Sequence, residues 1–147
     1  MLRELVDRFN RLFTRLHSRV YVGTKGWIGH RWTLVPSLIL HTLGRRSGVE
    51  RSVVLVYARD GSDYLVVGSN FGKDRPPFWL LNLEANSKVW MNVGHRRVQT
   101  TADIVAPDDP RYGRLFEIVN ANNRRRYERY RELTLRPIPV VVLTPSA

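Results

Sequence analysis

The chain has 147 residues, four tryptophans, no cysteine and a formal net charge of +11 at pH 7. The lack of cysteine excludes disulfides, thiolate metal sites and a cysteine nucleophile, and a hydrophobic fraction of 43% is typical of a folded domain. The charge predicts an anionic partner, which is nucleic acid, a membrane surface, or a small ligand with phosphates or carboxylates. No apolar run reaches the ~20 residues of a membrane-spanning helix.

Residues 2–21 have the periodicity of an amphipathic helix. Apolar residues recur every three or four positions, and arginines occupy the other face. Because the glycines of GTKGWIGH end this pattern, we predict an N-terminal helix and linker over 1–31 and one further domain over 32–147. A basic amphipathic helix lies on an anionic membrane surface or docks on the domain, and the sequence leaves both interpretations open.

From residue 37 onward, short apolar runs are separated by turn residues. Such runs predict strands, and Asp-Gly at 60–61 is typical of a hairpin. We expect about six strands, at residues 37–43, 51–58, 64–69, 88–93, 97–106 and 138–144. The first three are expected to form an antiparallel meander and the next two a second hairpin, with alternation in 97–106 that buries one face.

Two helical patterns interrupt the strands. A short helix is expected over 76–87, where prolines come first. A looser pattern covers 107–133, with Asp108 or Asp109 as its cap and Pro110 in its first turn. Helices at intervals rather than after every strand predict a mainly β fold, a split or closed antiparallel barrel with flanking helices, instead of a doubly wound sheet.

The connection TLGRRSGVERSV at 42–53 concentrates positive charge between two predicted strands. It places Arg45, Arg46 and Arg51 around Gly44 and Gly48. Glycine permits positive φ and exposes backbone N–H groups, and arginine binds phosphate or carboxylate through two parallel hydrogen bonds. A solvated hairpin tip accounts for the same residues, so this stretch alone does not decide between anion binding and solubility.

Two further stretches carry possible chemistry. GSNFGKDRPPFW at 68–79 places small residues at a strand end before a helix, which suits anion binding, although it lacks the GxxxxGK[ST] pattern of a nucleoside-triphosphate loop. In NNRRRYERYREL at 122–133, Tyr127 and Tyr130 share a helix face among arginines. These tyrosines stack on nucleic-acid bases, line a pocket beside a reacting group, or pack on the barrel.

The histidines show no metal-ligand spacing, so no metal site is expected, and His41 is expected to be a hydrogen-bonded structural residue. No arrangement typical of a nucleophilic or paired-carboxylate enzyme is present. An enzyme built from this sequence therefore needs a bound cofactor for the difficult chemistry.

In combination, these motifs resemble the deazaflavin-dependent nitroreductase family, which comprises actinobacterial oxidoreductases that use reduced coenzyme F420. The resemblance covers about residues 37–145 and includes the arginine stretch, GSNFG, the W-x-x-N-L helix, two tyrosines and the closing IPVVVLTP. It implies a split β-barrel related to flavin-binding reductases. It also implies hydride transfer to an electron-poor acceptor, which is a quinone, a nitroaromatic or an activated alkene.

The resemblance implies cofactor contacts from Gly44, Arg45, Arg46, Ser47, Gly48, Arg51, Val53, Gly68, Ser69, Asn70, Phe71, Gly72 and Trp79. Arg45 and Arg46 correspond to residues that hold the phosphate and glutamate tail, and Ser69 and Asn70 to residues that face the ligand. Tyr127 and Tyr130 correspond to tyrosines on the substrate side, where one of them or a water supplies a proton. Coenzyme F420 carries a phosphodiester and several carboxylates, so it explains the arginines better than FMN, which has one phosphate.

The chain departs from some members of that family. Asn70, Leu80 and Leu133 stand where some members have lysine, tyrosine and tryptophan, which bears on the acceptor rather than the cofactor. A non-catalytic F420 binder or carrier, an FMN-dependent reductase and a nucleic-acid-binding module remain alternatives. We expect a small-molecule acceptor, no specific nucleic acid, and a monomer or weak homodimer. We expect it in the cytoplasm, or peripherally at the inner face of the plasma membrane.

Overall fold

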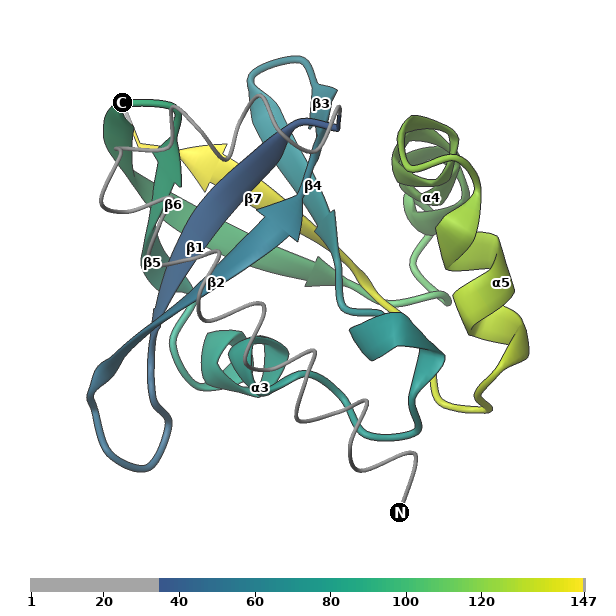
Figure 1. The fold of residues 1–147 in the computed structure, drawn as a ribbon, viewed down its shortest axis with the longest axis horizontal. Helices are drawn as coiled ribbons and strands as arrows, with labels where there is room; N and C mark the ends of the chain where they lie inside the picture. The colour runs from purple at the N-terminus through teal and green to yellow at the C-terminus, as the bar shows by residue number, and fades with distance from the viewer. Residues whose placement is uncertain (1–34, 147) are drawn as a thin grey trace.

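Seven strands form a single curled antiparallel sheet in the computed structural model, which describes residues 35–146 (Figure 1). The strands are β1 (Ser37–Leu43), β2 (Glu50–Val56), β3 (Ala58–Asp60), β4 (Asp63–Val67), β5 (Lys88–Val93), β6 (Arg96–Val105) and β7 (Val140–Pro145). Their order in the sheet is β2-β1-β5-β6-β7-β4-β3. The predicted mainly β split barrel is confirmed. The predicted helix at 2–21 and the domain boundary near residue 31 lie outside the described residues.

The predicted meander is confirmed in its two antiparallel pairings, β1 with β2 and β3 with β4, but its middle strand is not continuous. The run 51–58 is divided into β2 and β3, which follow each other in the chain but form opposite edges of the sheet. Between them, Tyr57 donates its N–H to the carbonyl of Pro36 (3.0 Å), and its buried ring meets Tyr64 edge to face. One residue therefore joins the two edges of the curled sheet at that end.

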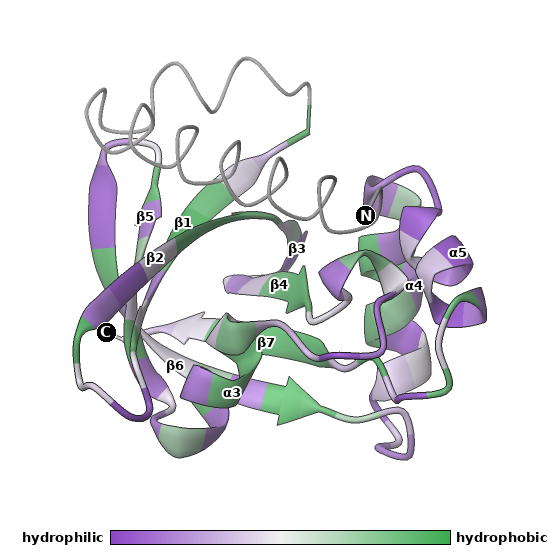
Figure 2. Cartoon of the chain, turned by 60° about the horizontal axis from the view of Figure 1, so that its bottom comes forward, coloured by the Kyte–Doolittle hydropathy of each residue, from purple (hydrophilic) through white to green (hydrophobic). Residues whose placement is uncertain are grey.

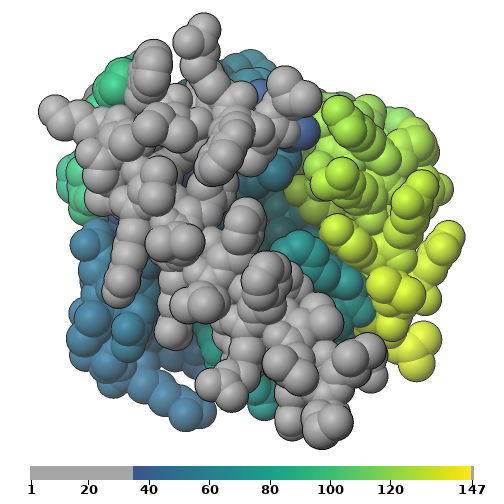
Figure 3. Space-filling model, viewed as in Figure 1, coloured from purple at the N-terminus to yellow at the C-terminus, as the bar shows by residue number. Residues whose placement is uncertain are grey.

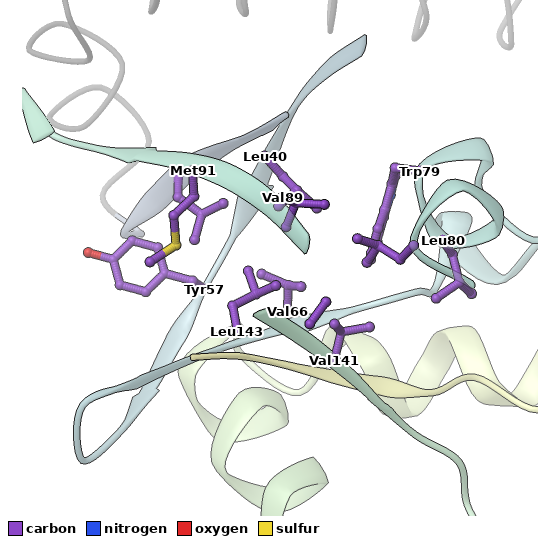
Figure 4. Close-up of a cluster of buried hydrophobic side chains, with 12 residues drawn as sticks. Leu40, Tyr57, Val66, Trp79, Leu80, Val89, Met91, Val141 and Leu143 are labelled. Atoms are coloured by element: carbon purple, nitrogen blue, oxygen red, sulfur yellow. The ribbon is translucent and has the colours of Figure 1, made fainter. Parts of the chain in front are cut away.

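Two hydrophobic clusters lie on the two faces of the sheet. The first fills the barrel and includes Leu40, Tyr57, Val66, Trp79, Leu80, Val89, Met91, Val141 and Leu143 (Figure 4). The second lies between the outer face of β4 and β7 and the helices near the C-terminus, and includes Leu65, Val67, Leu115, Val119, Tyr127 and Val140. Each large apolar side chain contributes about 1.5–3 kcal/mol on burial, so alternate residues of the same strands hold both layers together.

Three α-helices, α3 (Phe78–Ala85), α4 (Tyr112–Asn122) and α5 (Arg126–Glu132), and the 3-10 turn η1 (Asn70–Gly72) accompany the sheet in the described residues. The helix predicted over 107–133 is in fact two helices. Arg124 and Arg125 have φ angles of 54° and 59°, and this left-handed backbone cannot continue an α-helix.

The predicted cap of the long helix is also wrong in position. The helix α4 begins at Tyr112, two residues beyond Pro110, and no side chain caps its N-terminus. Asp109 instead accepts the N–H of Arg111 through its Oδ1 (2.9 Å), which forms a turn ahead of the helix. Hydrophilic residues occupy much of α4 and α5 (Figure 2), and no helix within residues 35–146 is long and apolar enough to cross a membrane.

Candidate functional site

The loop between β1 and β2 is an ordered turn. Gly44 donates its N–H to Val49 O (2.8 Å), Gly48 donates to Gly44 O (2.8 Å), and the Ser47 hydroxyl accepts the N–H of Val49 (3.2 Å). A Cβ on Gly44 would lie 2.7 Å from Ser47 Oγ and would displace that hydroxyl, and Gly48 has a φ of 67°, so the turn favours glycine at both positions. The sequence therefore builds a defined support for the arginines that follow Gly44.

Residues 44–51, which we name the arginine loop, carry uncompensated charge. The side chains of Arg45, Arg46 and Arg51 are exposed and have no carboxylate partner among the described residues. Arg51 pairs with Thr42 in the sheet register, and it shares a face of β2 with Val53, which packs against the barrel core. Arg51 therefore lies where the barrel interior opens toward the loop.

Asn82 of α3 connects the arginine loop to the rest of the domain. Its side chain is buried, accepts the N–H of Arg45 at Oδ1 (3.1 Å) and donates from Nδ2 to Thr42 Oγ1 (3.1 Å). The start of the arginine loop is thus fixed by a neutral amide rather than by a carboxylate. This contact leaves the positive charges of the loop free to bind an anion.

Residues 68–73, which we name the strand-end loop, pack between α3 and α5. A Cβ on Gly68 would lie 2.9 Å from Leu80 Cδ2, and one on Gly72 would lie 2.7 Å from the carbonyl oxygen of Tyr130. Asn70 and Phe71 have φ angles of 43° and 57°, which residues other than glycine seldom adopt. Backbone strain of this kind is concentrated at functional sites, so the loop is a candidate ligand contact.

The two predicted tyrosines lie together but differ in exposure. Their ring centroids are 6.2 Å apart, so the prediction that they share a helix face is confirmed. Tyr127 is buried in the second cluster, and burial raises its pKa to about 12. Tyr130 is partly exposed and meets the exposed ring of Phe71 edge to face at 6.0 Å. Tyr130 therefore has access to a ligand beside the strand-end loop.

Trp79 and His41 point to opposite faces of the sheet. Trp79 projects from α3 into the barrel core beside Leu40 and Val89 (Figure 4), which leaves its predicted cofactor contact a prediction. His41 is buried, and its ring bonds to Ser52 Oγ (2.7 Å) and Asn92 Oδ1, so the expected structural role is confirmed. The described residues contain no group of three or more His, Asp or Glu side chains suited to a metal ion.

The helix α3 contacts both candidate loops. Its residue Asn82 holds the arginine loop, and its residue Leu80 packs against the strand-end loop. In the orientation shared by Figure 1 and Figure 3 the arginine loop and α5 lie on opposite sides of the molecule, and the ribbon of Figure 1 shows η1 and α3 between them. The arrangement offers anion-binding cations on one side and exposed aromatic rings on the other.

Sequence reasoning missed two residues of this arrangement. Asn82 is the polar residue of the W-x-x-N-L motif, and its place among leucines was a usable indication of a buried hydrogen-bonding role. Arg136, which hydrogen-bonds to the strand-end loop, stands in LRPIP, where no local pattern marks it.

Comparisons with known proteins identify the class of protein that the chain resembles. The model of the F420H2-dependent quinone reductase family matches residues 13–145. An F420H2-dependent quinone reductase of Mycobacterium tuberculosis is 53% identical over 131 residues, which cover 88% of each chain. A solved F420-H2 dependent reductase (FDR-A) superposes with a TM-score of 0.66 and 26% identity over 74% of this chain and 93% of its own.

A further solved structure, a domain-swapped dimer, shares the fold. It superposes over 97% of this chain and 96% of its own with a TM-score of 0.68 and 23% identity. Neither the family model nor these relatives support FMN as the cofactor or a non-catalytic carrier role. The F420-using class of oxidoreductase predicted from the sequence is confirmed.

Proposed function

The chain belongs to the F420H2-dependent quinone reductase family, and on that premise we propose that it binds reduced coenzyme F420 and reduces a quinone. The observation that carries the proposal is the arginine loop. Its three guanidinium groups lack carboxylate partners among the described residues, although the turn beneath them is fixed in place. Fixed, uncompensated cations are what a ligand with several anionic groups requires.

The residues of the site fit such a cofactor. A guanidinium group binds a phosphate or a carboxylate through a pair of hydrogen bonds. Arg45, Arg46 and Arg51 supply three guanidinium groups. Glu50 lies in the same hairpin but pairs with Arg97 (3.0 Å), so it does not neutralise the loop. Gly44, Ser47 and Gly48 shape the turn, Val53 is partly buried against the barrel core, and Trp79 is buried within that core.

The bound cofactor supplies the hydride, and the protein supplies orientation and proton delivery. Tyr130 is the residue suited to proton delivery because its phenol is partly exposed beside Phe71. Tyr127 supports it from the core and, with a pKa of about 12, remains neutral at physiological pH. Nitroaromatics and activated alkenes are further acceptors that the open aromatic side of the site can accommodate.

The basic amphipathic pattern of residues 2–21 supports a second part of the proposal. We place the protein in the cytoplasm with peripheral attachment to the inner face of the plasma membrane, where membrane quinones are within reach. Co-sedimentation with anionic vesicles, with and without residues 1–21, tests this placement. Equal binding by the two proteins would exclude a lipid role for the helix. Sedimentation without vesicles reports whether the protein is the expected monomer or weak homodimer.

Titration with F420 and FMN side by side, followed by ligand fluorescence, tests the cofactor. We expect saturable binding of F420 and much weaker binding of FMN. Addition of a soluble quinone to the complex with reduced F420 should then restore the absorbance of oxidised F420. Binding without oxidation would indicate a carrier, and preferential binding of FMN would overturn the proposal.

A further inference from the structure

Arg136 lies between α5 and β7, and its guanidinium group donates hydrogen bonds to backbone carbonyls of the protein itself. Its Nε donates to Lys73 O (2.8 Å), its Nη1 to Gly68 O (3.1 Å), and its Nη2 to Ser69 O (2.7 Å). Nη1 also lies 3.4 Å from the carbonyl of Pro137. No carboxylate pairs with it among residues 35–146. A guanidinium group that donates hydrogen bonds to three backbone carbonyls of one loop fixes the position of that loop.

The planar trans peptide bond gives these contacts a direction. In a trans peptide unit the N–H points opposite to the carbonyl, and the structure contains no cis peptide bond among the described residues. Because the carbonyls of Gly68 and Ser69 point at Arg136, the N–H groups of Ser69 and Asn70 point away from it. Neither N–H donates to an acceptor among residues 35–146.

The charge of Arg136 strengthens the same two donors. A carbonyl that accepts a charge-assisted hydrogen bond polarises its peptide unit, which makes the attached N–H a better donor. The loop also requires external support because Asn70 and Phe71 are held at positive φ.

The neighbouring residue Thr134 adds a second tie. Its hydroxyl donates to Asp74 Oδ1 (2.8 Å) and accepts the N–H of Arg136 (3.2 Å). The segment 134–136 is therefore attached to the strand-end loop through Arg136 and to the residue that follows this loop through Thr134.

We propose that Arg136 is a positioning residue that holds the strand-end loop so that the N–H groups of Ser69 and Asn70 bind an anionic oxygen of the ligand. The inference rests on the proposed function for the identity of the ligand, which is F420. The anionic oxygen then belongs to its phosphate or to one of its carboxylates. Arg136 acts through the backbone and does not touch the ligand. This role distinguishes it from the arginines of the arginine loop, which bind the ligand directly.

Two ligands with the same ring separate this role from general support of the fold. We would titrate F420, and the same deazaflavin without its phosphate and carboxylate tail, into the parent, Arg136→Gln and Arg136→Lys. For Arg136→Gln we expect F420 binding to weaken by about tenfold and binding of the tailless deazaflavin to change by less than about twofold. The affinity of Arg136→Lys for F420 should fall between those of the parent and Arg136→Gln, because lysine keeps the charge but not the planar set of donors. Arg129→Gln, which removes one exposed charge from α5, should bind both ligands like the parent.

Unchanged F420 binding in Arg136→Gln, or equal loss of both ligands, would overturn the inference. Amide hydrogen exchange of the ligand-free proteins gives a readout independent of F420. We expect faster exchange at residues 68–73 in Arg136→Gln and in Arg136→Lys than in the parent, and unchanged exchange in both variants would also overturn the inference. If the parent itself does not bind F420 while exchange rises as expected, the proposed function fails and the loop-holding role of Arg136 stands.

Discussion

The arginine loop and the segments where α4 and α5 begin are both rich in arginine, but only the second group forms ion pairs. Arg111 and Arg125, which directly precede α4 and α5, pair with Asp103 and Asp109 and with Glu117 and Glu128, and Arg114 of α4 pairs with Asp60, at 2.7–3.2 Å. These partners lower the pKa of Asp60 and Asp109. The arginines within α5, in contrast, form no ion pair among the described residues. In the arginine loop no guanidinium group has a carboxylate partner among the described residues, and Arg45 is held by Asn82 through its backbone N–H.

This difference shows that the arginines behind the net charge of +11 are not equivalent, because some are ion-paired and others are not. Exposed ion pairs contribute little stability and cancel most of each other's field. Unpaired arginines on a rigid turn keep their field and their hydrogen-bonding capacity for a ligand. Charge therefore indicates a binding site only after the internally paired residues have been set aside.

The largest expected effect comes from removing the unpaired charges. Replacement of Arg45, Arg46 and Arg51 by alanine should weaken F420 binding by about 100-fold or more, since each guanidinium contributes a charge-assisted contact. The matched control is the alanine triple variant at Arg111, Arg114 and Arg125. It removes the same charge from ion-paired positions at the starts of α4 and α5, which we name the paired region. Fluorescence titration at two salt concentrations should show little loss for the control. A similar loss in both variants would mean that overall charge, not the arginine loop, attracts the cofactor.

A second, smaller effect separates the two tyrosines of α5. We expect Tyr130→Phe to lower kcat for quinone reduction by about tenfold, because its phenol is partly exposed and available for proton transfer. Tyr127→Phe should lower it by less than about threefold, because its phenol is buried and retains its proton. Steady-state kinetics with a soluble quinone provide the measurement. If neither substitution slows turnover, the proton comes from water.

Asn82 tests whether the arginine loop must be held as well as charged. Asn82→Ala leaves Thr42 and the N–H of Arg45 without their partner, so the free energy of unfolding should fall by about 1–3 kcal/mol. F420 binding should weaken by about fivefold because the loop loses its support on α3. Asn120→Ala is the control, since that buried amide accepts the N–H of Glu128 (3.1 Å) in the paired region.

Chemical denaturation and F420 titration of the two variants decide the point. Both should lose stability, and only Asn82→Ala should lose affinity. Equal affinity in the two variants would mean that the arginine loop binds without being fixed to α3.

The elements with local signals were predictable from the sequence. The Asp60-Gly61 turn joins β3 to β4, the prolines precede α3, and alternate residues of β6 are buried. The pairings between strands distant in sequence were not predictable: β1 pairs with β5, and β7 pairs with both β4 and β6. The break at Arg124 and Arg125 was also missed, since arginine carries no preference for the left-handed backbone found there.

The candidate site was predictable where residue type alone indicated chemistry. Arginines and glycines marked the arginine loop, and small residues marked the strand-end loop. Asn82 and Arg136 act by holding backbone groups of those loops, and their partners lie 37 to 68 positions away in the chain. Neither their residue type nor their spacing reveals such a contact before the fold is known.

The smallest expected effect concerns His41, on the opposite face of the hairpin from Arg51. Burial, with a smaller contribution from Arg97, lowers the pKa of His41 below its ordinary value of 6.5, although Asn92 and Glu50 oppose the shift. The unfolded chain therefore binds the proton more readily, so the contribution of neutral His41 is complete above the ordinary pKa and is lost as the pH falls through the lowered one. We expect stability to decrease modestly between about pH 8 and about pH 5.5, and His41→Gln to flatten this dependence. Thermal melts of both proteins over that range would measure it, and an equal slope in the variant would assign the titration to another group. F420 binding at the upper end of the range should be the same in both, because His41 belongs to the structural face of the hairpin.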